Sequence, residues 1–186
     1  MPLPATRSIA NIRRTIQSVI GNSVQVGADA IPVYHDYSFA DPDNLRGTGN
    51  IDRAWVETHF IQQRAGSRGF TTLQIDCYSR IGEEGSATSD AFGMYVESIA
   101  DEILSLFSGV DGQGNQRGYI QVQDFAADPL NPVNVNMFLL MQTPTGDIGV
   151  PQERVRLSLD QDFRRVTITM AFRTIQDAAG PAAFYT

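Results

Sequence analysis

The chain has 186 residues and a formal net charge of −7 at pH 7, and hydrophobic residues make up 42% of it. This length allows one domain with a real core and is too short for two comfortable ones, so we expect a single domain over residues 1–186. The composition is typical of a soluble globular protein and excludes a disordered chain. The longest apolar run, residues 137–141, is too short to cross a bilayer, so no membrane contact is expected.

The charged residues restrict the possible partners. All fourteen basic residues are arginine, and twenty-one acidic residues outnumber them. Backbone phosphates require a cationic face, so a chain this acidic is a poor candidate for gripping DNA over an extended surface. The N-terminus shows no apolar segment followed by a small-residue cleavage site, so we expect no secretory signal and synthesis in the cytoplasm.

Apolar residues recur at helical spacing near the N-terminus and predict a helix over residues 6–20, with Thr6 as its N-cap and Gly21 at its end. The apolar stripe consists of Ile9, Ile12, Ile16, Val19 and Ile20. Arg13 and Arg14 lie off this stripe, so we expect them to face solvent or a partner protein.

A short strand is expected next, at residues 30–37, where Pro32 suggests an edge or a first-strand position because proline cannot donate to a ladder. The segment that follows, residues 39–52, is rich in Asp, Asn, Gly and Pro and predicts an irregular loop. Loops of this length in compact domains are usually functional or mobile.

Two alternating segments, residues 55–61 and 72–78, predict the strands of a hairpin. The apolar sides of the two strands are expected to be formed by Val56, Thr58, Phe60, Leu73, Ile75 and Cys77. The connection, residues 62–69, is longer than a tight turn requires and carries Arg64 and Arg68. Hairpin geometry does not demand two arginines at this tip.

The clearest element is a helix over about residues 88–107, with Gly109 suited to its end. Its predicted buried stripe is formed by Phe92, Tyr95, Val96, Ile99, Ile103, Leu106 and Phe107. Asp101 and Glu102 lie off that stripe. Burial of so many large side chains would make this helix an anchor of the core.

The rest of the chain is predicted to form strands. Alternation favours a strand at residues 119–125 and a longer, more apolar strand at residues 133–142. Residues 157–172 predict a hairpin that turns at residues 160–162. The apolar sets expected to face each other across it are Val155, Leu157 and Leu159, and Val166, Ile168, Met170 and Phe172.

The order of these elements predicts the fold class. A helix, a strand, a hairpin, a helix and then several strands favour an α+β domain. We expect a mixed, largely antiparallel sheet with two helices packed on one face and long loops. A small acidic domain with such loops is suited to contacts with other proteins.

Residue types that carry chemistry are few. Cys77 is the single cysteine, so an intrachain disulfide is impossible, and its alternation with Leu73 and Ile75 favours a buried structural role. His35 and His59 lie on different predicted strands without the spacing of a metal site. We therefore predict no catalytic residue, no cofactor and no metal.

Two alternative chemical interpretations are weaker. The glycine-rich residues 109–118 follow a helix and precede a strand, which is the wrong order for a phosphate-binding loop. Asp41, Asp43 or Asp124 together with a histidine could serve a small-ligand binding domain or a hydrolase. Turn formation and capping explain acidic residues in such Pro- and Asn-rich segments equally well.

A resemblance to a known family follows from the succession of segments. After an amphipathic N-terminal helix come "IPVYHDY", a long loop, "AWVETHFIQQ", "RAGSRG", and "LQIDCYSRIG" leading into "DAFGMYVESIADEILSLF", with a closing strand "RVTITMAFRT". This pattern resembles the tail terminator, or tail completion, proteins of long-tailed bacteriophages. The likeness covers nearly the whole chain and consists of pattern and element order.

The resemblance implies a structural role without catalysis. Subunits of that family have an α+β fold and form a hexameric ring that caps the tail tube and joins it to the head–tail connector or stopper protein. It implies a virion protein at the head–tail junction and a channel through which DNA passes without specific binding. The alternatives within phage assembly are a tail tube subunit or a head completion protein.

The resemblance also suggests which residues meet partners. We expect the hairpin to act as an assembly arm, with Arg64 and Arg68 reaching an acidic neighbour. Arg13 and Arg14 on the first helix are further candidate interface residues. The competing interpretation is that these arginines only keep the surface soluble, since most surface ion pairs contribute little.

Overall fold

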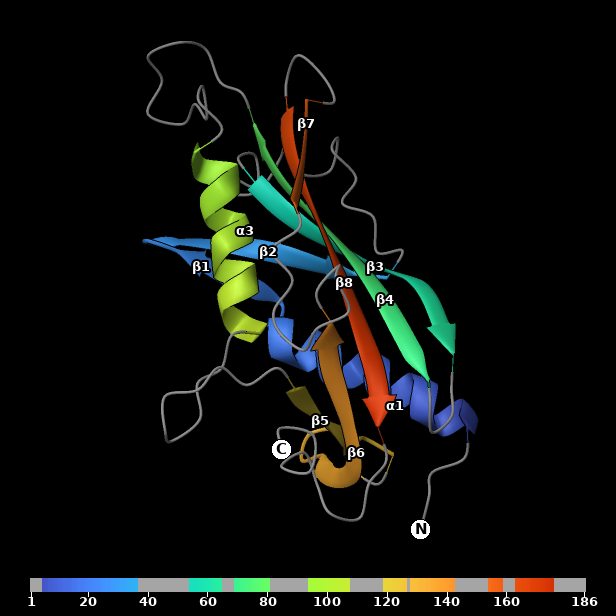
Figure 1. Cartoon of the computed structure of the whole chain (residues 1–186). Helices are drawn as coiled ribbons and strands as arrows, with labels where there is room; N and C mark the ends of the chain where they lie inside the picture. Colours follow the sequence, from blue (N-terminus) through green and yellow to red (C-terminus); the bar gives the residue numbers. More distant parts are fainter. Residues whose placement is uncertain are drawn as a thin grey trace, which may run out of the picture.

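A computed structural model describes residues 5–36, 54–64, 69–80, 94–107, 119–126, 128–142, 154–158 and 163–175 (Figure 1). Within these ranges the chain forms two helices and eight strands. In chain order the elements are α1 (Ala5–Ile20), β1 (Ser23–Val26), β2 (Asp29–His35), β3 (Ala54–Arg64), β4 (Phe70–Arg80), α3 (Met94–Phe107), β5 (Tyr119–Asp124), β6 (Val133–Gln142), β7 (Arg154–Ser158) and β8 (Phe163–Ile175).

The strands belong to one sheet of order β1-β2-β3-β4-β8-β6-β5, and β7 pairs with β8 beside this path. The pairing of β2 with β3 is parallel, and the other pairs are antiparallel. The predicted α+β class with a mixed, largely antiparallel sheet is confirmed. No helix in the described part of the chain is long and apolar enough to span a membrane.

The strand β8 organises the sheet (Figure 1). One side of it pairs with β4 from Phe163 to Arg173. The other side is shared, because β7 pairs with residues 164–168 and β6 with residues 171–175. The predicted hairpin of β3 and β4 lies beside it, in the register Val56–Cys77, Thr58–Ile75 and Phe60–Leu73.

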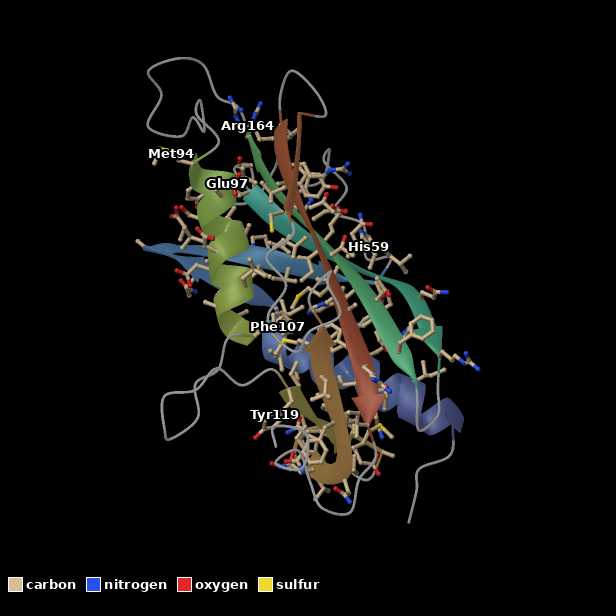
Figure 2. All side chains as sticks on the ribbon, viewed as in Figure 1. His59, Met94, Glu97, Phe107, Tyr119 and Arg164 are labelled. Atoms are coloured by element: carbon tan, nitrogen blue, oxygen red, sulfur yellow. The ribbon has the colours of Figure 1, made fainter. Side chains whose placement is uncertain are left out.

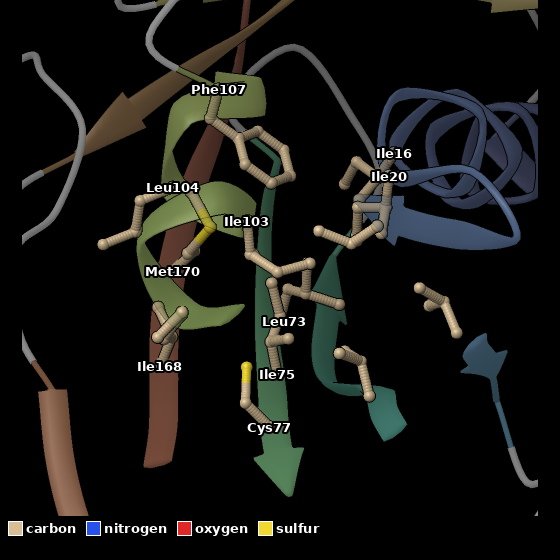
Figure 3. Close-up of a cluster of buried hydrophobic side chains, with 14 of the residues drawn as sticks. Ile16, Ile20, Leu73, Ile75, Cys77, Ile103, Leu104, Phe107, Ile168 and Met170 are labelled. Carbon is tan, nitrogen blue, oxygen red and sulfur yellow. The ribbon is translucent and has the colours of Figure 1, made fainter. Parts of the chain in front are cut away.

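Both helices pack on the same face of the sheet, as predicted. Leu73, Ile75 and Cys77 of β4 lie opposite Met170, Ile168 and Val166 of β8, and all six side chains are buried. Ile103 and Phe107 of α3 and Ile16 of α1 belong to the same apolar cluster (Figure 3). Burial of each large side chain contributes roughly 1.5–3 kcal/mol before conformational entropy is counted. We call this side of the sheet the helix face and the other side the open face.

The helix α1 also closes one edge of the sheet. It ends at Gly21, whose φ of 76° is a left-handed conformation that suits glycine and whose N–H donates to the carbonyl of Gln17. Two buried polar side chains of α1 accept from the backbone of the β5 segment: Thr15 Oγ1 from Gln123 N–H and Asn11 Oδ1 from Phe125 N–H. These bonds occupy donors that an edge strand would otherwise offer to another chain.

Several details of the predicted helices and strands need correction. Leu106 is 41% exposed, and Leu104 is buried in its place, because Leu106 lies about 90° from the centre of the apolar stripe at 100° per residue. The predicted start of this helix, including Phe92, lies outside the described residues. The strand β1 was not predicted, although Gly27, with a φ of 61°, marks the two-residue turn between Val26 and Asp29.

The predicted edge position of Pro32 is wrong, since β2 lies between β1 and β3. The N–H of Val33 donates to the carbonyl oxygen of Asn22, on the side of β2 that faces β1. Backbone nitrogens of successive residues point to opposite sides of a strand, so the nitrogen of Pro32 points toward β3. Pairing of β2 with β3 begins only at Val33. The proline therefore interrupts no ladder bond.

The apolar pairing expected between β7 and β8 is also wrong. The register places Val155 opposite Thr167 and Leu157 opposite Arg165, rather than opposite Val166 and Ile168. A shift of one residue in register exchanges the two faces of a strand.

Candidate functional site

The structure places three of the four candidate interface arginines, and Arg68 lies outside the described residues. Arg14 is exposed on α1, and Arg64 is exposed at the end of β3. Arg13 is 40% exposed but holds contacts within its own chain. Its guanidinium lies 5.2 Å from the centre of the Phe60 ring, its Nε donates to Gln63 Oε1, and its NH1 lies 3.9 Å from an oxygen of Asp36.

The contacts of Arg13 with its own chain add a structural role that the sequence did not predict. Phe60 and Gln63 belong to β3, so Arg13 attaches α1 to the strand that ends at Arg64. The cation above an aromatic ring is worth about 0.5–1 kcal/mol at a partly exposed site. Arg13 therefore supports the position of the hairpin end rather than extending from it.

A second arginine that the sequence analysis did not single out, Arg173 of β8, lies beside the end of the hairpin. Arg64 lies opposite Phe70 of β4, and Phe70 lies opposite Arg173 of β8. Residues opposite each other share a face, so these three lie in one row across the open face. Neighbouring strands are about 4.8 Å apart, which places the two arginine Cα atoms about 10 Å apart on either side of Phe70. We call Arg64, Phe70 and Arg173 the arginine row.

Sequence reasoning missed Arg173, although a signal was present. Residues of β8 alternate between the buried Val166, Ile168, Met170 and Phe172 and a second set that includes Arg173. This period of two predicts that Arg173 faces away from the helices. Its place beside Phe70 depends on the pairing of β4 with β8, which no local pattern specifies.

Further along the open face, polar side chains form three rows of three across β3, β4 and β8. The rows are Trp55, Tyr78 and Arg165, then Glu57, Asp76 and Thr167, then His59, Gln74 and Thr169. Two carboxylates, Glu57 and Asp76, therefore lie directly opposite each other. Like charges in this position destabilise a sheet unless other groups compensate them.

Asp76 is compensated by its neighbours. It is 3% exposed, and its carboxylate accepts hydrogen bonds from Thr167 Oγ1 at 2.5 Å and Gln74 Nε2 at 2.7 Å. Arg165 Nε lies 4.0 Å from the same carboxylate and is itself buried without a hydrogen-bond partner. Buried charges need such partners, so this arrangement explains how Asp76 is tolerated under the open face.

Glu57 has its own partners on β3. Trp55 Nε1 donates to Glu57 Oε1 at 3.1 Å, and His59 Nε2 lies 3.5 Å from the other carboxylate oxygen. Trp55 stacks on Tyr78 with ring centres 4.6 Å apart and meets Phe163 edge to face. Burial raises the pKa of Tyr78 above its usual value, so its hydroxyl stays neutral near pH 7.

These rows have the residue types of an acid–base site, but their contacts are those of a structural network. Each carboxylate accepts a hydrogen bond from a neighbour on its own strand. Across the described residues, no three His, Cys, Asp or Glu side chains are arranged to hold a metal ion. The rows can bind a polar or charged surface through His59, Gln74 and Thr169, which are at least partly exposed.

Two residues considered for a hydrolase, His35 and Asp124, lie apart. His35 contacts Gly21 O through Nε2 at 2.8 Å and Thr58 Oγ1 through Nδ1 at 2.9 Å. Asp124 accepts from Asn11 Nδ2 at 3.0 Å. Asn11 and Gly21 are ten residues apart along α1, which corresponds to about 15 Å, so His35 and Asp124 do not form a pair. Asp41 and Asp43 lie outside the described residues.

The outer side of α3 forms a second charged surface. Asp101 and Glu102 are exposed there, between Met94, which is 73% exposed, and Leu106. The helix contains Glu97 as a third acidic residue and has no basic residue. We call the residues Met94, Asp101, Glu102 and Leu106 the acidic helix surface. A scan against models of known protein families and a search of the curated proteins found no match to this chain.

Proposed function

We propose that the chain is a structural virion protein of a long-tailed bacteriophage. In this proposal it acts as a tail terminator at the head–tail junction. Six copies form a ring that caps the tail tube and joins it to the head–tail connector or stopper protein. DNA passes through the channel of the ring, and the protein performs no catalysis.

The observation that carries this proposal is the agreement between element order and fold. The resemblance to tail terminators implies an α+β subunit, and the chain has that fold, with α1 and α3 on one face of the sheet. The hairpin of β3 and β4 precedes α3 along the chain.

The surface chemistry is consistent with a subunit built for protein contacts. The arginine row and the acidic helix surface each combine exposed charge with apolar side chains, which is typical of interfaces. The polar rows around Asp76 have partners inside the chain and supply a rigid support for the open face.

The test of the proposal distinguishes it from its closest alternative. The purified chain is mixed with tail tubes and examined by negative-stain electron microscopy. A terminator stops at one ring on the end of a tube. A tail tube subunit instead polymerises into long stacks, and a head completion protein leaves the tube ends bare. Either of these two outcomes would contradict the proposal.

We predict that the chain has no affinity for DNA at physiological salt. A ring of six carries 42 formal negative charges, six times −7. Such charge repels the phosphate backbone, which favours passage without adhesion. The measurement is a mobility-shift titration with duplex DNA of random sequence. Non-specific binders reach dissociation constants of about 10⁻⁴–10⁻⁶ M, so a shift at micromolar protein would show this prediction to be wrong.

A further inference from the structure

The acidic helix surface belongs to a helix without a basic residue. Its acidic residues are Glu97, Asp101 and Glu102. The residues three and four positions from Glu102 include Ser98, Ser105 and Leu106 but no base. Met94 extends from the first turn of α3 away from the sheet (Figure 2). This surface therefore presents acidic and apolar groups together on the outer side of α3.

The arginine row carries the charge opposite to that of the acidic helix surface, and it also includes apolar side chains. Arg64 and Arg173 are exposed on either side of the half-buried Phe70. Ile61 lies at the irregularity in the pairing of β3 with β4 and is 57% exposed. Two guanidinium groups beside exposed apolar side chains are suited to a partner surface on which carboxylates lie next to apolar side chains.

The two surfaces lie on opposite sides of the sheet. The side chains of α3 enter the core on the helix face, where Phe107 meets Phe172 with ring centres 6.0 Å apart. Arg173 follows Phe172 in β8, so its side chain leaves from the open face. One chain therefore cannot bring its own acidic helix surface onto its own arginine row, but two copies can.

We propose that neighbouring copies of this chain associate head to tail, with the acidic helix surface of one copy on the arginine row of the next. Asp101 and Glu102 accept forked hydrogen bonds from Arg64 and Arg173, and Met94 or Leu106 covers Phe70. Two different surfaces of one chain make a heterologous contact, which closes into a ring when the rotation between copies permits it. This inference deepens the proposed ring and rests on it for its biological setting.

The test uses two charge-reversed variants of the full chain, R64E/R173E and D101R/E102R. Sedimentation velocity at low salt measures the association of each variant alone. We expect wild-type protein to associate reversibly and each variant to associate about tenfold more weakly or worse, because like charges then meet. The matched control is Arg80→Glu, which reverses an exposed arginine at the opposite end of β4 and should associate as wild type does.

The decisive sample is an equimolar mixture of the two variants. Each contact in the mixture joins a basic surface to an acidic one, either in the original or in the exchanged arrangement, so we expect association to return. Thermal melting of each variant, expected within a few degrees of wild type, verifies that the fold is intact. The proposal is overturned if wild-type protein stays monomeric, if R64E/R173E associates normally, or if the mixture stays monomeric.

This experiment contains no phage component, so its failure differs from failure of the proposed function. If a ring still forms at the end of a tail tube with both charge-reversed variants, the proposed interface is wrong and the proposed function stands. If the chain associates head to tail but does not bind tail tubes, the proposed interface stands and the proposed function is wrong.

Discussion

Asp76→Ala is expected to lower the free energy of unfolding by about 3 kcal/mol. The substitution removes the acceptor of the hydrogen bonds from Thr167 and Gln74, both below 3.0 Å. It also removes the carboxylate that lies next to the guanidinium of Arg165, whose Nε is buried. The measurement is urea unfolding followed by circular dichroism.

Two further variants separate the charge from the packing. Arg165→Met in the Asp76→Ala background should recover part of the loss, since it removes a partly buried guanidinium that has lost its carboxylate. Thr169→Ala, an exposed position on the same face of β8, should change stability by about 0.5 kcal/mol or less. A loss below about 0.5 kcal/mol for Asp76→Ala would show that the polar rows contribute little to the fold.

Arg64→Glu combined with Arg68→Glu is expected to abolish the joining of heads to tails while the monomer stays folded. Arg64 is exposed at the end of β3, so reversal of its charge there should cost the fold little. At an interface the same change brings like charges together and removes a forked donor from any carboxylate partner, which costs several kcal/mol.

The measurement pairs thermal melting of the purified variant with the yield of joined particles in a complementation assay. Unchanged melting with a yield reduced by about tenfold or more supports the assembly arm. Arg14→Glu is an informative comparison, because it reverses an exposed candidate arginine that belongs to α1 and not to the hairpin. Normal joining by the Arg64 and Arg68 double variant would show that these arginines only maintain solubility.

Local periodicity was sufficient to predict most elements of the fold. The alternation in β3 and β4 identified Val56, Leu73, Ile75 and Cys77 as buried, and all four are. The range Val133–Gln142 was predicted without error. In these segments each residue's environment depends mainly on which face of its own element it occupies.

Features that depend on pairing between distant segments were not predictable. Asp76 alternates with buried residues and gives no sign in the sequence that Thr167, ninety-one positions later, covers it. The arginine row likewise requires that Phe70 lie opposite Arg173. Leu106 differs, since its exposure follows from its angular position at the margin of the apolar stripe, which the sequence alone specifies.

The chemistry of the candidate site was predicted less well than the fold for the same reason. Exposed arginines can be named from a sequence, but the contacts of Arg13 with Phe60 and Gln63 appear only when α1 is placed against β3. Similarly, His35 and Asp124 can be excluded as a pair only because the structure shows that Asp124 contacts Asn11 and that His35 contacts Gly21, at the other end of α1.

The most direct measurement of the central claim is cryo-electron microscopy of intact virions and of isolated tails. The account predicts one ring of six copies of this chain at the head-proximal end of the tail tube, between the tube and the connector, with an open channel. Density for the chain along the length of the tube, within the head, or nowhere in the virion would contradict it.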